Sequence, residues 1–269
     1  MYFENSIKRK YIIMELSNKY KFVDFTLNNY PRLLSLALKN YEFKLFDEEY
    51  FYKSILLRHD LEFSIPIALQ MAQMEAELGI RSTYFVQLHS EFYNTLEKSS
   101  IYAIKQIKNL GHQIGLHFDS HFWNIQEETQ LDRSIEFDKS ILENYLETQI
   151  KAFSFHNNTP FTLSCRKDKY GGLINVYSDY FRERYAYNAD SLGYWRYERL
   201  EDRLREAKED ALQILIHDGM WQDEVLPPRR RVYKVIDENA ERLKRLYDEH
   251  LTKIGQKNID WEGDVNGED

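Results

Sequence analysis

The sequence predicts a mixed α/β fold in which helices alternate with the strands of a parallel sheet. Short apolar segments recur along the chain, several of them continuously apolar, as expected of parallel strands covered on both faces. Longer amphipathic segments separate them, and an apolar content of 43% is sufficient for a core. About seven strands with intervening helices indicate an α/β barrel, closed or incomplete. A doubly wound open sheet is the main alternative, because periodicity alone does not separate the two.

The strand predictions follow the apolar runs in chain order. The predicted strands are Ser54–Leu61, Ser82–Leu88, Gln113–Phe118, Lys151–Phe155, Tyr185–Ala189 and Leu212–His217, with a weaker one at Gly172–Tyr177.

The helix predictions rest on apolar spacing and on end signals. Ser64 is a suitable N-cap with Pro66 in the first turn, and Gly79 and Gly111 stand where two helices should end. The predicted helices are Tyr30–Asn40, Ser64–Gly79, Ser99–Leu110, Glu127–Leu146 and Val232–Leu251.

Length and charge limit the class of protein. We expect a single barrel domain over residues 1–259 and an acidic tail over 260–269. A net charge of −8 argues against a general nucleic-acid surface, and no apolar run is long enough for a membrane span. The single cysteine, Cys165, cannot form an internal disulfide, which favours a reducing compartment, so we predict a cytoplasmic protein.

Polar side chains collect at the predicted strand ends, where parallel α/β folds place their functional groups. The first strong strand leads into Arg58-His-Asp-Leu-Glu62, and alternation puts Asp60 and Glu62 on one side of the chain. The pair could supply metal ligands or a catalytic base. An ion pair with Arg58 or a helix cap is the structural alternative.

Histidines follow the same pattern at three further strand ends. His117 ends a strand, and His121 would share its face if the chain turned helical there. Together with the upstream carboxylates, the pair indicates a two-histidine, one-carboxylate site for Zn²⁺ or another divalent metal. His156 and His217 also end apolar strands, and for either one alone a buried structural histidine is the default interpretation.

In this order the motifs resemble the NodB-like polysaccharide deacetylases, carbohydrate esterase family four. The matching segments are the acidic pair, Gly79-Ile-Arg-Ser-Thr-Tyr-Phe-Val86, Gly111–His121 and Leu215-Ile-His217. A subgroup with Arg-His-Asp-x-Asp at the first motif, associated with surface-polysaccharide biosynthesis, is more similar still. The resemblance covers roughly residues 25–221 and implies a distorted (β/α)7 barrel.

The resemblance also implies roles for individual residues. Asp60 would be the general base and His217 the general acid, while Glu62, His117 and His121 would hold the metal, most simply Zn²⁺. His156 or Asp119 could replace His121 as the third ligand.

Two departures from the family pattern bear on activity. Glu62 stands where the family usually has Asp. The usual Arg-containing third motif is replaced by Phe155-His-Asn-Asn-Thr-Pro-Phe161, so the arginine that steadies the base is missing there and Arg58 is the candidate to replace it.

Aromatic and charged residues near the strand ends suit a carbohydrate ligand, although most aromatic side chains must pack the core. The candidate substrate-binding residues are Arg58, His156, Asp190, Trp195, Arg196 and Trp221.

From these observations we expect a metal-dependent deacetylase that removes an N-acetyl group from a nucleotide- or lipid-linked sugar during O-antigen, lipopolysaccharide or capsule assembly. Two alternatives stay open. One is an inactive barrel that binds a sugar or a metal, and the other is a hydrolase of another non-peptide C–N bond.

Overall fold

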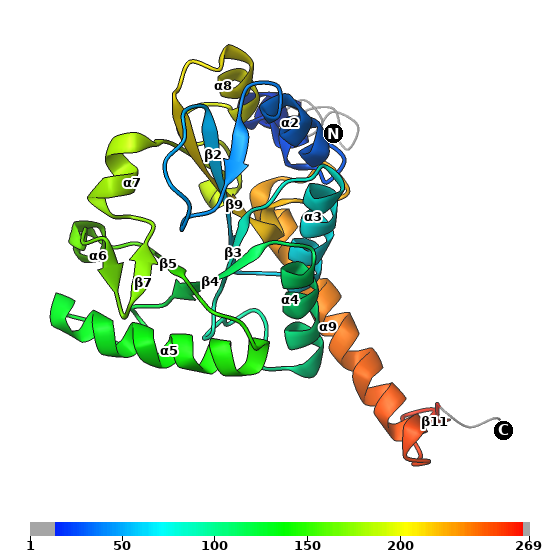
Figure 1. The fold of residues 1–269 in the computed structure, drawn as a ribbon. Helices are drawn as coiled ribbons and strands as arrows, with labels where there is room; N and C mark the ends of the chain where they lie inside the picture. Colours follow the sequence, from blue (N-terminus) through cyan, green and yellow to red (C-terminus); the bar gives the residue numbers. More distant parts are fainter. Residues whose placement is uncertain (1–13, 266–269) are drawn as a thin grey trace.

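A curved and mostly parallel sheet forms the centre of the molecule, described here for residues 14–265 from a computed structural model (Figure 1). The strand order is β6-β7-β5-β4-β3-β2-β9-β8, and β1 pairs with β2 beside this path. All neighbouring pairs are parallel except β6 with β7. The strands are β1 (Glu42–Lys44), β2 (Ser54–Leu61), β3 (Thr83–Val86), β4 (Gln113–Phe118), β5 (Ala152–Phe155), β6 (Lys169–Tyr170), β7 (Leu173–Asn175), β8 (Ala186–Ala189) and β9 (Ala211–His217).

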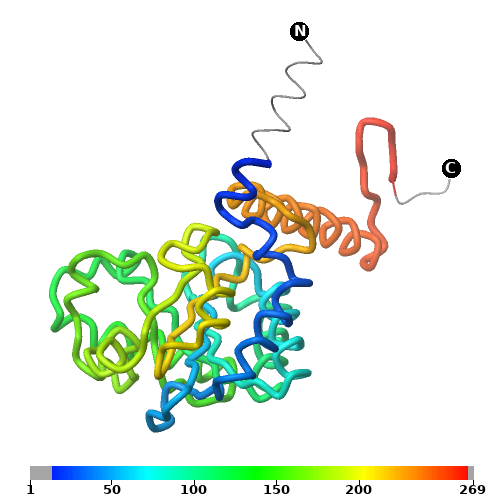
Figure 2. The backbone as a smooth tube through the Cα atoms, turned by 90° about the horizontal axis from the view of Figure 1, so that it is seen from above, coloured from blue at the N-terminus to red at the C-terminus, as the bar shows by residue number. Residues whose placement is uncertain are grey.

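Seven parallel strands, from β8 through β9, β2, β3, β4 and β5 to β7, make up the barrel wall. Within residues 14–265, β8 and β7 are not paired with each other, so the barrel is open along one side. The prediction of a distorted (β/α)7 barrel is confirmed, and the doubly wound alternative is wrong. Viewed from above, the chain curls around this open barrel (Figure 2).

Helices cover the outer face of the sheet, with α3, α4 and α5 following one another along it (Figure 1). The helices are α2 (Tyr30–Ala37), α3 (Ile65–Glu77), α4 (Lys98–Asn109), α5 (Leu131–Leu146), α6 (Pro160–Ser164), α7 (Asp179–Arg184), α8 (Leu200–Glu206) and α9 (Pro228–Lys253), and the short 3₁₀ segments are η1 (Phe22–Phe25), η2 (Glu128–Gln130), η3 (Ser191–Gly193) and η4 (Asp218–Met220). The helix α9 projects from the body towards a small hairpin of β10 (Ile259–Asp260) and β11 (Gly263–Asp264).

Apolar side chains fill three regions around the sheet. One lies between the central strands and α3 to α5, where Ile104, Leu116 and Leu131 are fully buried. A second joins α2 and α8 to β2 and β9, and a third fills the barrel interior around Phe85. Gly115 on β4 is required there, because a Cβ atom at this position would collide with the Phe85 ring.

The structure contains all seven predicted strands and all five predicted helices, with ends shifted by a few residues. It adds β1, β6 and the short helices α6 to α8, which were not predicted. The hairpin of β10 and β11 occupies part of the segment predicted as a tail, whose last four residues lie outside the described residues. In the described part of the chain, no helix is both long and apolar enough to cross a lipid bilayer.

Candidate metal centre and active-site cavity

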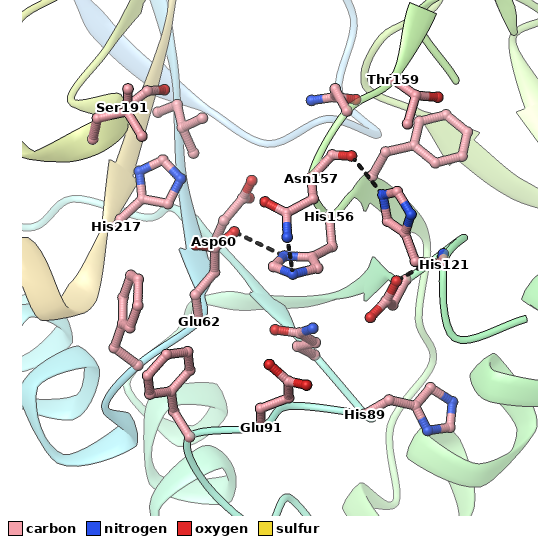
Figure 3. Close-up of a pocket in the computed structure, with 18 of the residues that line it drawn as sticks. Asp60, Glu62, His89, Glu91, His121, His156, Asn157, Thr159, Ser191 and His217 are labelled. Carbon is pink, nitrogen blue, oxygen red and sulfur yellow. Dashed lines mark hydrogen bonds and ion pairs between the residues drawn. The ribbon is translucent and has the colours of Figure 1, made fainter. Parts of the chain in front are cut away.

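The carboxyl ends of neighbouring strands open into a cavity of about 1030 Å³. Register brings the site residues together, since Asp60 on β2 pairs with His217 on β9, and His117 on β4 pairs with Ser154 on β5. Figure 3 shows His217 on one side of Asp60 and Glu62, and His156 on the other. Residues far apart in the sequence therefore line one cavity.

Glu62, His117 and His156 form the candidate metal centre. Glu62 Oε1 lies 3.1 Å from His117 Nε2 and 2.9 Å from His156 Nδ1, and the two histidine nitrogens are 3.2 Å apart. Among residues 14–265 these three make up the group of side chains whose donor atoms could share one ion. His156 follows β5, and Glu62 follows β2, so their places depend on the sheet register.

The donor set fits a divalent transition metal. Zn²⁺ binds imidazole nitrogens and carboxylate oxygens at roughly 2.0–2.2 Å, so tetrahedral ligand atoms lie about 3.3 Å from each other. The three observed separations are close to one face of such a tetrahedron, which would leave the fourth position for water or substrate. Burial alone would raise the pKa of Glu62, but the nearby His217, His117 and His156 hold this pKa well below its usual range. A charged carboxylate is the form that binds a cation.

Asp60 is buried beside this centre and held at both oxygens. The Arg58 guanidinium donates to Oδ2 at 2.9 Å, and the Ser154 hydroxyl lies 3.2 Å from Oδ1. Ser154 Oγ is also 2.7 Å from His117 Nδ1, so one hydroxyl links the acidic residue to a metal-site histidine. Arg58 is fully buried and also donates to Tyr177 Oη at 2.7 Å. Arg58 therefore orients Asp60 from behind. It is not among the residues that line the cavity, so we correct its assignment as a substrate-binding residue.

His217 is oriented by Asp190, which is fully buried. Asp190 Oδ1 lies 2.6 Å from His217 Nδ1, and the same carboxylate accepts from the His217 backbone N–H and from Trp221 Nε1. Because Nδ1 faces Asp190, Nε2 is the nitrogen left for the cavity. Burial alone would lower the pKa of His217, but the Asp190 and Glu62 carboxylates raise it to about 10.

The structure does not bring His121 into the metal group. A histidine pair spaced i and i+4 shares a face only in a helix, but His117 is the fifth residue of the extended strand β4 and a turn follows. His121 Nε2 instead lies 3.0 Å from the Asn157 carbonyl oxygen. Asp119 lines the cavity, and its Oδ1 accepts from the backbone N–H groups of His121 and Phe122. Of the two alternatives to His121 as third metal ligand, His156 and Asp119, the geometry supports His156.

Two of the predicted substrate-binding residues, His156 and Arg196, line the cavity. Trp221 is fully buried in the core next to α2, and Trp195 packs against Phe25. We therefore correct both tryptophans to packing roles, because neither is among the residues that line the cavity. Asp190 is likewise a partner of His217 and not a cavity group.

Sequence reasoning missed the roles of Ser154 and Asp218. Ser154 lies two residues before His156, so strand alternation puts both on one face. Asp218 directly follows His217, is fully buried, and accepts from the backbone N–H groups of Glu62 at 3.0 Å and of Ser64. The position of Asp218 directly after the strand-end His217 is the sequence feature that could have indicated its role.

Comparison with known proteins gives matches only among solved structures. No protein-family profile matches the sequence, and no curated protein matches it. A family 4 carbohydrate esterase from Bacillus anthracis is 17% identical with a TM-score of 0.43, over 78% of this chain and 85% of that one. The chitin deacetylase of Colletotrichum lindemuthianum is 16% identical with a TM-score of 0.40, over 68% and 81%. A CE4 family pseudoenzyme from Bacillus anthracis is 8% identical with a TM-score of 0.40, over 68% and 60%. Similarity this low carries no information on activity.

Proposed function

We propose that this protein is a metal-dependent hydrolase that removes an N-acetyl group from a sugar. The observation that carries the proposal is the position of Glu62, His117 and His156 in one cavity with Asp60 and His217. A metal centre, a fixed carboxylate and a protonated imidazole are groups that metal-assisted amide hydrolysis uses.

Each of these residues has a separate role in the proposed reaction. Glu62, His117 and His156 hold the cation, which when bound polarises an acyl carbonyl and lowers the pKa of water. Asp60 is the general base and accepts a proton from the attacking water, while Arg58 keeps its carboxylate in place.

His217 is the general acid. The hydrogen bond and negative charge of Asp190 favour the protonated imidazole, and Nε2 is the nitrogen available to donate to the departing amine. A neutral amine leaves far more readily than an amide anion, so this proton is required for C–N cleavage.

The finer predictions from the sequence belong to this proposal as well: zinc as the metal, a cytoplasmic setting and a role in surface-polysaccharide assembly. For the nucleotide- or lipid-linked substrate, the described cavity lining offers little support. It carries the carboxylates of Asp60, Glu62, Glu91 and Asp119 but a single guanidinium, that of Arg196, to meet a diphosphate.

Acetate release from N-acetylated sugars by the purified, zinc-loaded protein tests the proposal. We expect turnover that disappears on metal chelation and falls by roughly 10²- to 10⁴-fold in Asp60→Asn. Glu224→Gln, on an exposed residue, is the matched control and should leave the rate unchanged. Bound metal without any release would favour the inactive barrel, and release of formate or ring opening of a cyclic amide would favour another C–N hydrolase.

A further inference from the structure

An aromatic pair, one ring exposed and the other half-buried, lies in the cavity wall, away from the residues used in the chemistry. The rings of His89 and Phe122 stack with centroids 3.5 Å apart and planes 7° from parallel. Both residues line the cavity, and 58% of Phe122 is exposed although it is a large apolar side chain. His89, in the loop after β3, is seen beyond Glu62 on the opposite side from His217 (Figure 3).

Hydrogen bonds to a buried carboxylate hold this pair in place. His89 Nε2 lies 3.0 Å from Oδ1 of Asp138, a fully buried residue of α5. The other oxygen of Asp138 accepts from Trp123 Nε1 at 3.0 Å, and the Trp123 ring meets Phe122 edge to face. One buried carboxylate thus fixes both neighbours of the Phe122 ring.

The loop that carries Phe122 is also anchored on its other side. Asp119 accepts the backbone N–H groups of His121 and Phe122, and His121 contacts the Asn157 carbonyl oxygen. Because the Phe122 side chain and its loop are already held in place, binding a ligand costs little further conformational entropy. The exposed ring is therefore a preorganised contact surface.

The volume of the cavity and the charge of its lining indicate the class of ligand. A volume of about 1030 Å³ far exceeds an acetyl group, so the remainder of the substrate must occupy the rest. Glu91 and Asp119 in the same wall accept hydroxyl hydrogen bonds and repel phosphates. A pyranose ring combines an apolar C–H face for Phe122 with hydroxyl groups for these carboxylates.

We propose that the His89–Phe122 pair is a binding subsite for the neutral pyranose next to the sugar that is deacetylated. The inference rests on the proposed function and narrows its substrate class to neutral oligosaccharides of at least two sugars. A nucleotide-linked monosaccharide, whose base could also stack on Phe122, is the competing ligand, which the acidic wall disfavours.

Calorimetric titration of metal-free protein separates this subsite from catalysis. The probes are N-acetylglucosamine, its β-1,4-linked dimer and UDP-N-acetylglucosamine. We expect the dimer to bind about tenfold more tightly than the monomer, and Phe122→Ala to remove most of this difference. Phe122→Tyr should keep it. The control is Tyr102→Ala, which removes an equally exposed aromatic ring on α4.

An unchanged dimer preference in Phe122→Ala would overturn the subsite, and so would a loss confined to the UDP sugar. If the wild type binds none of the three probes, the subsite is also refuted. Acetate release then decides the proposed function separately: release that is insensitive to Phe122→Ala leaves the hydrolase standing without the subsite.

Discussion

At the scale of single residues, the site depends on groups that never touch substrate. Asp218 is fully buried, and its carboxylate holds the backbone of the β2–α3 loop that presents Glu62. Its own position immediately after His217 ties the end of β9 to the end of β2. One side chain therefore sets the spacing between the proposed metal ligand and the proposed acid.

Replacing Asp218 with asparagine should loosen this arrangement. The new side chain would offer one acceptor oxygen and an N–H₂ group to a loop that presents only donors, so at least one backbone bond is lost. We expect zinc affinity to fall about 10- to 100-fold with little change in circular dichroism. Asp223→Asn, on a nearby exposed residue, is the control. Equal zinc affinities of the wild type and Asp218→Asn would contradict this role.

A second residue-scale feature is the buried cluster behind β2. His59 points away from the cavity, opposite to Asp60, and its Nε2 lies 2.7 Å from Glu75 Oε1 on α3. The hydroxyl of Tyr84 donates to the same oxygen at 3.0 Å. Burial alone would raise the pKa of Glu75, but His59, with smaller contributions from His112, lowers it to about 2.

This cluster predicts an acid-dependent loss of stability. Because the pKa of Glu75 is lower in the folded state than its ordinary 4.5, the stabilisation is complete above pH 4.5 and is lost as pH falls towards 2. The difference corresponds to about 3 kcal/mol. Urea unfolding of Glu75→Gln should show lower stability at pH 7 and a decline between pH 5 and 2 that is smaller by this amount. Parallel declines in both proteins would contradict the prediction.

At the scale of elements, α9 holds the loop that lines the cavity between β3 and α4. Arg242 donates from both terminal nitrogens to the Glu97 carboxylate, at 2.9 and 3.2 Å. Asn239 Nδ2 donates to the Phe92 carbonyl oxygen at 3.3 Å, one turn earlier on the same face. Phe92 itself lines the cavity, so the helix acts on the shape of the cavity wall from outside.

Removing the Arg242–Glu97 ion pair should loosen the loop without unfolding the protein. The Arg242–Glu97 pair is partly exposed, so Arg242→Ala should cost at most about 1 kcal/mol of global stability. Amide hydrogen exchange over residues 87–97 should accelerate about fivefold. Lys244→Ala, which removes an exposed ion pair on the same helix, is the control. Unchanged exchange in Arg242→Ala would show that α9 does not restrain the loop.

The long elements were predictable because their signals are local. The strand β2 is buried at every position, and its apolar residues 55–57 lead directly into the polar residues of its functional end. α3 has the predicted Ser64 cap, whose hydroxyl accepts from Ile67 N–H, and Pro66 in its first turn. β1 and β6, by contrast, have three and two residues, too few for any period, and their strand geometry comes from pairing with β2 and β7.

The site was predictable to the extent that it follows strand alternation. Asp60 and Glu62 share a face as expected, whereas the third histidine depended on what the chain does after β4. The spacing of His117 and His121 suggested a helical turn, with His156 as one of two alternates. The structure shows that His156, which follows the neighbouring strand β5, is the residue that lies next to His117.

At the scale of the whole molecule, distant segments are joined around the open barrel. Thr26 and Gln222 form a parallel bridge, and Asp24 accepts two hydrogen bonds of 2.7 Å from Arg199. Such contacts join residues that lie far apart in the sequence, so no local sequence pattern predicts them. The same holds for the metal centre, whose ligands come from the ends of three separate strands.

Calorimetric titration with Zn²⁺ of the wild type, His156→Ala and His121→Ala tests this convergence most directly. Loss of one of three protein ligands should weaken binding at least 100-fold in His156→Ala. His121→Ala should bind within about threefold of the wild type, since its imidazole contacts the Asn157 carbonyl oxygen outside the metal group. The opposite pattern, with zinc lost in His121→Ala and kept in His156→Ala, would contradict the site described here.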